Sequence, residues 1–263
     1  MNSIRGRYNS IFLSMSTFKH FFGSSSDIFP DTAVVAPFIP VEKFSHNGHL
    51  VDTFKGKMYS GGIIERDAKR FAVISCRIGD RLVGDAILWL KGSPVKNIIF
   101  VGSCGGLNGS NIGDLLVCTA AFNGEGFTRY HCSEKQIEDI LKEEALMRGD
   151  DKYTNKCADF ICEHISRDMK VTEGEIFTIG SIAAETCENI KIISRHGFKG
   201  IEMELSAVYS ASKISGIRAV GLLYVSDLPG EKAIGEELSQ TEKKNHKRGL
   251  NEVVRLSTEF AAQ

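Results

Sequence analysis

From Thr32 onward, the sequence alternates short, almost uninterrupted apolar runs with longer segments whose apolar residues recur at helical spacing. Such runs are typical of strands covered on both faces, and strands that alternate with helices form largely parallel sheets between helices. The predicted strands are 33–37, 71–76, 97–102, 115–121, 175–180, 200–204 and 218–227. The predicted helices are 80–90, 133–147, 204–214 and 250–261. The pattern therefore predicts an α/β fold.

A single domain is predicted over residues 32–263, because no repeat or linker interrupts that stretch. Residues 1–31 differ in composition: they carry Arg5, Arg7 and Lys19, several serines, and no acidic residue among the first 26. This composition is compatible with an organelle transit peptide. A frayed or locally docked extension explains the same composition, so both interpretations of this N-terminal extension stay open.

The overall composition indicates a soluble globular protein that acts on a small molecule. Hydrophobic residues make up 42% of the chain, and 32 basic residues balance 33 acidic ones, which favours neither nucleic acid nor an anionic membrane as a partner. The seven cysteines include no C-x-x-C pair, so reduced thiols in the cytoplasm are expected and no zinc site is predicted. No apolar stretch approaches the length of a membrane-spanning helix.

Three predicted strands end in polar groups, and ligands of parallel α/β sheets bind beyond the carboxyl ends of the strands. The first is "FVGSCGGLNGSNIGD" at 100–114, where a glycine turn over 102–106 is expected. Backbone N–H groups that no side chain shields, together with the Ser103 hydroxyl, suit an oxyanion or a sugar hydroxyl. A plain connection between strand and helix explains the same residues.

The other two strand ends carry carboxylates. Glu202 and Glu204 lie two residues apart, so on a strand they share one face while Met203 points away, and a carboxylate of this pair could accept hydrogen bonds from two vicinal hydroxyls. Ser226 and Asp227 end the most apolar strand, where desolvation favours a neutral aspartic acid that can donate a proton. Solvated or helix-capping side chains are the alternative at both places.

Taken together, these segments resemble the nucleoside phosphorylase and nucleosidase superfamily. The resemblance rests on "VKNIIFVGSCGGLNGSNIGDLLVCTAAFNGEG" and "GFKGIEMELSAVYSASKISGIRAVGLLYVSD", in that order, within about residues 32–262. It implies a three-layer α/β sandwich around a mixed, partly barrel-like sheet. It also implies a homodimer or a trimer of dimers, and cleavage of the N-glycosidic bond of a nucleoside that is expected to be a purine nucleoside. No cofactor is implied, and inorganic phosphate is a possible co-substrate.

The resemblance also implies a role for each matching residue. Asp227, beside Ser226, would protonate N7 of the base, and Glu204 with Met203 and Glu202 would hold the ribose. The residues implied at the base are Cys104, Gly105, Ile182 and, as a support for the acid, Lys243. The residues implied at the phosphate or nucleophile are Gly102, Ser103, Arg77 and Arg81.

The sequence departs from the superfamily where phosphate would bind. Glu42 and Phe100 stand where arginines are expected, although phosphate recognition depends on guanidinium forks. Arg77 and Arg81 are either substitutes, binders of the 5′-phosphate of a nucleotide, or surface residues. Phosphorolysis, hydrolysis of a nucleoside or of a nucleotide such as AMP, and a non-catalytic storage or binding role all stay open.

Overall fold

A computed structural model describes residues 14–131, 137–143 and 145–263. Its strands are β1 (Thr32–Val35), β2 (His49–Lys55), β3 (Ser60–Arg66), β4 (Lys69–Ser75), β5 (Asn97–Gly106), β6 (Leu115–Gly124), β7 (Leu146–Arg148), β8 (Val171–Ile179), β9 (Gly200–Glu202) and β10 (Arg218–Asp227). Its α-helices are α2 (Met15–Phe22), α3 (Val41–Ser45), α4 (Asp80–Leu90), α5 (Phe127–His131), α6 (Ile137–Leu141), α7 (Asp151–His164), α8 (Cys187–Arg195), α9 (Leu205–Ser215) and α10 (Gln240–Ala261).

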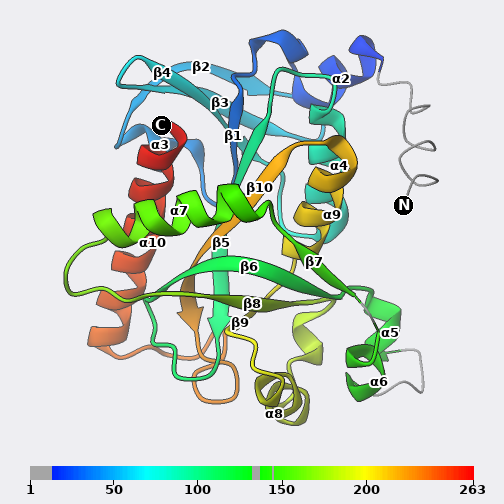
Figure 1. Ribbon diagram of the computed structural model, residues 1–263, viewed down its shortest axis with the longest axis vertical. Helices are drawn as coiled ribbons and strands as arrows, with labels where there is room; N and C mark the ends of the chain where they lie inside the picture. The colour runs from blue at the N-terminus through cyan, green and yellow to red at the C-terminus, as the bar shows by residue number, and fades with distance from the viewer. Residues whose placement is uncertain (1–13, 132–136, 144) are drawn as a thin grey trace.

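The strands form one mixed sheet that closes on itself at one end. Along the sheet the order is β10-β6-β8-β9-β5-β1-β4-β3-β2, and β10 also pairs with β5. The five strands β5, β10, β6, β8 and β9 therefore make a closed ring, while β1, β4, β3 and β2 extend from it as an open sheet (Figure 1). The mixed, partly barrel-like sheet implied by the resemblance is confirmed.

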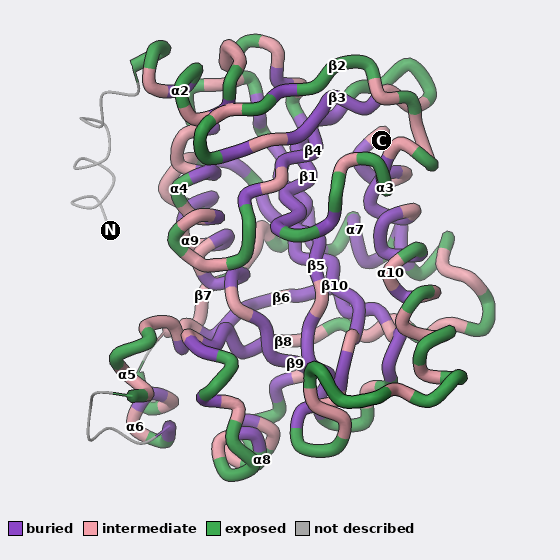
Figure 2. Tube along the Cα trace, turned by 180° about the vertical axis from the view of Figure 1, so that it is seen from behind, coloured by how far each residue is buried: buried purple, intermediate pink, exposed green. Residues whose placement is uncertain are grey.

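Helices cover both faces of this sheet, because the strands are apolar on both sides. In β1, Ala33 and Val35 join the core beneath α4 and α9, whereas Val34 joins the core beneath α7 and α10. Figure 1 shows α4 and α9 side by side on one flank, with α10 on the other flank and α7 crossing in front of the barrel. The three layers are therefore helix, sheet and helix, and Figure 2 shows the buried sheet between them.

The glycine-rich segment is part of a strand and not the turn expected from the sequence. β5 runs to Gly106, because its last residues pair with β10 on one side and with β9 on the other. Gly105 lies opposite both Asp227 and Ile201, and a Cβ built on it would come within 2.4 Å of Pro229 Cγ. These glycines thus allow a close approach of neighbouring chain segments.

Three further expectations about elements need correction. The predicted strand 200–204 ends at Glu202, so Glu202 and Glu204 do not share a strand face: Glu204 is the N-terminal cap of α9. The predicted helix 133–147 ends at Leu141 and is followed by β7, while residues 132–136, which include the predicted start of this helix, lie outside the described part. The last helix begins at Gln240 and not at 250, because its first turns are polar and carry no apolar signal.

Part of the N-terminal segment is docked on the domain. Ser14 caps α2, and Phe18 and Phe22 stack at 4.4 Å between ring centroids inside the core that β1 and α4 share. Phe29 packs edge-on against both rings. Residues 1–13, which include Arg5 and Arg7, lie outside the described part. No helix within the described ranges is long and apolar enough to span a membrane.

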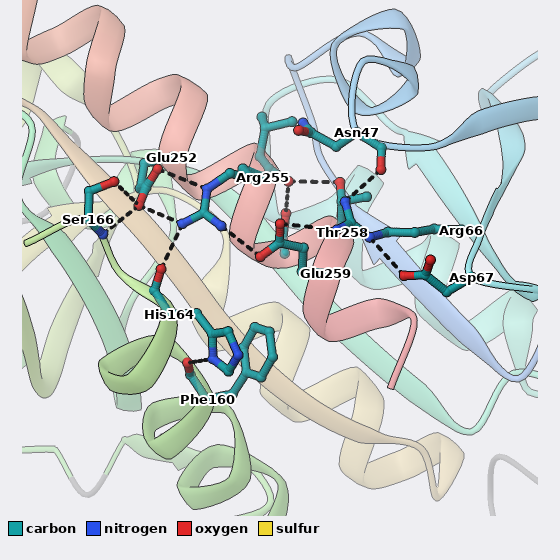
Figure 3. A network of polar contacts seen from close by, with 12 residues as sticks. Asn47, Arg66, Asp67, Phe160, His164, Ser166, Glu252, Arg255, Thr258 and Glu259 are labelled. Atoms are coloured by element: carbon teal, nitrogen blue, oxygen red, sulfur yellow. Dashed lines mark hydrogen bonds and ion pairs between the residues drawn. The ribbon is translucent and has the colours of Figure 1, made fainter.

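A polar network fastens α10 to the elements around it (Figure 3). Arg255 donates to Glu252 and Glu259 on its own helix and to the carbonyl of His164 at the end of α7. Arg66 on β3 reaches Glu259 at 3.2 Å from the other side. Glu252 also accepts hydrogen bonds from the backbone N–H and the hydroxyl of Ser166, both at 2.9 Å. The C-terminal half of α10 is therefore tied to its neighbours at Glu252, at Arg255 and at Glu259.

Candidate functional site

A cavity opens where β5, β9 and β10 end. Its lining residues are Phe38, Ile78, Ser103, Cys104, Gly105, Ile182, Glu185, Ile201, Glu202, Met203, Glu204, Ser226, Asp227 and Ile234. They come from segments far apart in the sequence and include nine residues proposed from the sequence alone, namely Ser103, Cys104, Gly105, Ile182, Glu202, Met203, Glu204, Ser226 and Asp227. A larger depression of about 800 Å³ adjoins it on the far side of Gly106 and Leu228 but contains none of these residues.

The barrel brings the strand ends together. β5 and β10 are parallel, so their carboxyl ends meet, and Asp227 lies beside Gly105. On the other side of Gly105 lies Ile201, the residue before Glu202. The strand register therefore places an aspartate and a glutamate on either side of a strand that offers no side chain at Gly105.

Asp227 is positioned by an irregularity in its strand. The pairing of β10 with β5 shifts between Val225 and Asp227, so Ser226 bulges out and the aspartate points to the cavity. The Ser226 hydroxyl donates to Asp227 Oδ1 at 2.7 Å. Burial raises the pKa of Asp227, while the Ser226 hydrogen bond and the charge of His246 act in the opposite direction. A raised pKa favours the protonated carboxyl that a general acid needs.

The N-terminus of α9 forms the opposite wall. Glu202 accepts from the backbone N–H groups of Glu204 and Leu205, both at 2.7 Å. Thr178 caps the next free N–H group, that of Ser206, at 3.0 Å and donates to Glu202 Oε1 at 2.5 Å. These buried acceptors lie at the positive end of the helix dipole, which stabilises negative charge where no cation is present.

Glu204 is held by a glycine. Gly79 adopts φ +128°, a conformation that only glycine accepts readily, and donates its backbone N–H to Glu204 Oε1 at 2.7 Å. Burial raises the pKa of Glu204 to about 7, against the Gly79 hydrogen bond, and the charges of Asp80 and Glu125 raise it further. One Glu204 oxygen is thus fixed, and the carboxylate lines the cavity.

A further carboxylate stands behind Glu204. Glu125 accepts from the Ser206 hydroxyl and from the backbone of Ala207, and it is hydrogen-bonded to Asp80. Burial raises the pKa of Glu125 to about 7. Burial and the neighbouring Glu204 charge likewise raise the pKa of Glu202 to about 8. The structure thus gathers carboxyl groups around one helix end, where they ionise less readily than carboxyls in water.

The charge of the cavity is entirely acidic. Of its lining residues, all within the described ranges, Glu185, Glu202, Glu204 and Asp227 are acidic and none is lysine, arginine or histidine. The described part of the chain also contains no group of three or more His, Cys, Asp or Glu side chains arranged to hold a metal ion. Donor groups of a neutral or cationic ligand suit such a cavity better than an anion does.

The mouth of the cavity is apolar. Phe38, Ile78, Ile182 and Ile234 line the cavity, yet each is between 44% and 61% exposed. Large apolar side chains gathered at an opening are typical of a surface that a ligand or another protein covers. Ile182, proposed to stack on a base, belongs to this group.

Several residues proposed from the sequence lie outside the cavity lining. Gly102 is buried within β5, Arg77 and Arg81 are exposed, and Lys243 is exposed on α10 with Glu237 at 3.5 Å. Ser103 does line the cavity, and its hydroxyl is hydrogen-bonded to Tyr224. The roles assigned to all these residues stay predictions.

Two ionisable residues in or beside the cavity were missed by the sequence analysis, as were the apolar lining residues Phe38, Ile78, Ile201 and Ile234. His246 lies three residues beyond Lys243, and it is the charge of His246 that acts on Asp227. Glu185 lines the cavity in the loop before α8. A histidine inside a polar helix turn and a glutamate beside a helix cap have no distinctive sequence pattern, so neither stands out before the fold is known.

The chain belongs to the phosphorylase superfamily, whose family model matches residues 39–262. Among curated proteins it is 28% identical over 150 residues to a DeoD-type purine nucleoside phosphorylase of Clostridium novyi, covering 56% of this chain and 60% of that protein. A protein of the same name from Bacillus cytotoxicus is 24% identical over 172 residues, which is 64% of this chain and 65% of that one. The aligned parts therefore span less than two thirds of these relatives.

Solved structures share the fold at lower identity. Uridine phosphorylase from Vibrio fischeri ES114 superimposes with a TM-score of 0.71 at 18% identity, covering 88% of this chain and 91% of that one. The 5′-methylthioadenosine/S-adenosylhomocysteine nucleosidase from Neisseria meningitidis gives 0.65 at 20% identity, covering 88% and 97%. The same fold is thus found in a uridine phosphorylase and in a nucleosidase.

Proposed function

We propose that this chain cleaves the N-glycosidic bond of a purine-type nucleoside and that water, not inorganic phosphate, is the nucleophile. The observation that carries the choice of water is the acidic cavity without a basic side chain in its described lining. A phosphate dianion needs guanidinium forks or ammonium groups to offset its desolvation, and carboxylates at contact distance repel it. Water needs neither.

The same carboxylates suit the transition state of this reaction. When the bond from C1′ to the base nitrogen breaks, positive charge develops on the sugar and negative charge on the base. Glu204 would accept hydrogen bonds from the 2′- and 3′-hydroxyls, and Asp227 would transfer its proton to N7 so that the base leaves uncharged. Water then forms the new bond to C1′ and loses a proton, which leaves free ribose and free base.

Phosphorolysis is the second candidate, because the curated relatives named above are purine nucleoside phosphorylases. It would place phosphate beside Ser103 and would require Arg77 or Arg81 to turn from the surface into the cavity. Assembly into a homodimer or a trimer of dimers stays a prediction alongside either chemistry.

The test incubates the full chain with adenosine, inosine, uridine or AMP, with and without inorganic phosphate, and identifies the sugar product. We expect free ribose from a purine nucleoside at a rate that does not depend on phosphate. Ribose 1-phosphate that forms only with phosphate would establish phosphorolysis instead. Ribose 5-phosphate would indicate a nucleotide substrate, and no product from the whole panel would favour a storage or binding role.

A further inference from the structure

Glu185 is a cavity carboxylate for which the proposed mechanism has no use. It follows the short 3-10 turn Ile182–Ala184 and directly precedes Thr186, whose hydroxyl caps α8. Its backbone N–H donates to the Ile182 carbonyl at 3.0 Å, and the Asn189 side chain donates to the Ala184 carbonyl at 2.8 Å. The loop that carries Glu185 is therefore fixed on both sides, so the carboxylate has a defined position.

The carboxylate itself has no hydrogen-bond donor within the described residues, although it is only partly exposed and faces the cavity. A ligand that covers the cavity would take the remaining water from this carboxylate, and a ligand N–H or O–H would offset the cost of that desolvation. The position at the start of α8 favours the charged form, because the helix dipole is positive there. Glu185 is thus placed to accept a hydrogen bond from a ligand in the cavity.

Asp227 lines the same cavity. Burial raises the pKa of Glu185 to about 7, and the negative charge of Asp227 raises it further. Two interacting carboxyls resist double ionisation, so near neutral pH one proton serves both. In the state that can transfer a proton to the base, that proton is on Asp227, and the cavity then presents both a donor and an acceptor.

A donor beside an acceptor matches one edge of a 6-aminopurine. Adenine offers the N7 acceptor and the 6-amino donor side by side, whereas a 6-oxopurine offers two acceptors, N7 and O6, along the same edge. Among the described lining residues, the side-chain donors other than protonated carboxyls are Ser103, Ser226 and Cys104, and Ser226 is already bonded to Asp227. A 6-oxo group would therefore face the Glu185 carboxylate without a donor.

We propose that Glu185 selects 6-aminopurine nucleosides over 6-oxopurine nucleosides by accepting a hydrogen bond from the 6-amino group, next to the N7 atom that Asp227 protonates. This inference rests on the proposed function and names its substrate class. Good paired contacts to a base edge discriminate by about 5- to 150-fold. We expect wild-type kcat/KM for adenosine to exceed that for inosine by a factor in this range.

The decisive variant is Glu185→Gln, which keeps the shape but lets an amide N–H₂ donate to O6. We expect the ratio of kcat/KM for adenosine to that for inosine to fall at least about tenfold, with inosine cleavage kept or improved. Glu188→Gln is the matched control, because Glu188 is exposed in the first turn of α8, three residues after Glu185, and does not line the cavity. Glu185→Asp, which restores a carboxylate, should recover part of the preference.

A binding measurement separates this inference from the reaction. Titration calorimetry with free adenine and hypoxanthine should show that wild type binds adenine more tightly and that Glu185→Gln loses this preference. An unchanged preference in the variant, or a wild type that favours inosine and hypoxanthine, would overturn the role of Glu185 while leaving glycosidic cleavage in place. A chain that cleaves no nucleoside but still binds adenine through Glu185 would refute the proposed function and keep the inference.

Discussion

The proposed proton transfer from Asp227 to the base can be tested by replacing Asp227 with asparagine. Asparagine has the same shape, accepts the Ser226 hydroxyl at the position of Oδ1, and removes only the acidic proton. Because Asp227 is only 7% exposed, bulk solvent reaches its position poorly and does not easily replace that proton. General acid catalysis typically contributes about 100- to 10,000-fold, which corresponds to roughly 2.7 to 5.4 kcal/mol in activation free energy.

The assay compares two substrates that differ in their need for a proton. The adenine that leaves adenosine must take up a proton, whereas the p-nitrophenolate that leaves p-nitrophenyl β-riboside is stable as an anion. We expect Asp227→Asn to lower kcat for adenosine by at least about 100-fold and kcat for the p-nitrophenyl substrate by less than about tenfold. Glu231→Gln, an exposed carboxylate in the following loop, serves as the control and should leave both rates unchanged.

Two results would refute this reasoning. Equal losses on both substrates would mean that Asp227 supports the cavity and does not deliver a proton. Wild-type turnover of adenosine would remove Asp227 from the chemistry altogether. A thermal melt of the variant shows whether the fold is intact, which is expected because Asn preserves the only side-chain hydrogen bond described for Asp227.

Three further outcomes follow from the carboxylates. Glu204→Gln keeps the Gly79 hydrogen bond but loses the charged acceptor, so kcat/KM for adenosine should fall about 10- to 150-fold. The kcat/KM for 2′-deoxyadenosine, which lacks one of the two hydroxyls, should fall much less. Equal losses of kcat/KM for the two substrates would contradict diol binding. The pKa of folded Glu125 is raised to about 7, so protonated Glu125 contributes stability that is fully present below pH 4.5 and is lost as the pH rises through 7. Thermal melts should therefore show that wild type loses stability from about pH 6 to 8.5. At the upper end of this range, Glu125→Gln should be more stable than wild type by about 1 to 3 kcal/mol. For Glu252 burial favours a higher pKa, but the Arg255 and Ser166 hydrogen bonds outweigh it and lower the pKa. Glu252→Gln should therefore cost about 1.5 to 3 kcal/mol in urea unfolding at pH 7. This difference should shrink as the pH falls below the ordinary glutamate pKa and through the lowered pKa of folded Glu252.

The sequence predicted the positions of the strands that line the cavity better than the conformation of the residues at their ends. β10 was expected over 218–227 and is found there, because an uninterrupted apolar run covered on both faces has a plain signal. The glycines of β5 were expected to turn, since glycine in isolation favours turns. Pairing with β9 and β10 on both sides, a contact between residues about 100 positions apart, keeps them extended instead.

The sequence likewise predicted some residues of the site and missed others. Residues at strand ends, such as Ser103, Glu202 and Asp227, were found because strand ends gather at one edge of a sheet. Glu185 and His246 were not, because they act from a loop and from a helix turn whose positions depend on tertiary packing. The pairing of Lys243 with Glu237 likewise depends on a loop path that local sequence does not encode.

The closed ring of strands has a consequence for how a protein of this kind can change its substrate. Glu202 and Asp227 end the barrel strands β9 and β10, and Glu204, the residue proposed to hold the sugar, follows two residues beyond β9. A shift of these carboxylates would therefore disturb the register of the barrel. By contrast, Phe38, Ile78, Glu185 and Ile234 sit on connections outside the ring, where replacement disturbs no ladder. Substitutions in these connecting segments can therefore change substrate selectivity while the residues proposed to cleave the glycosidic bond stay in place.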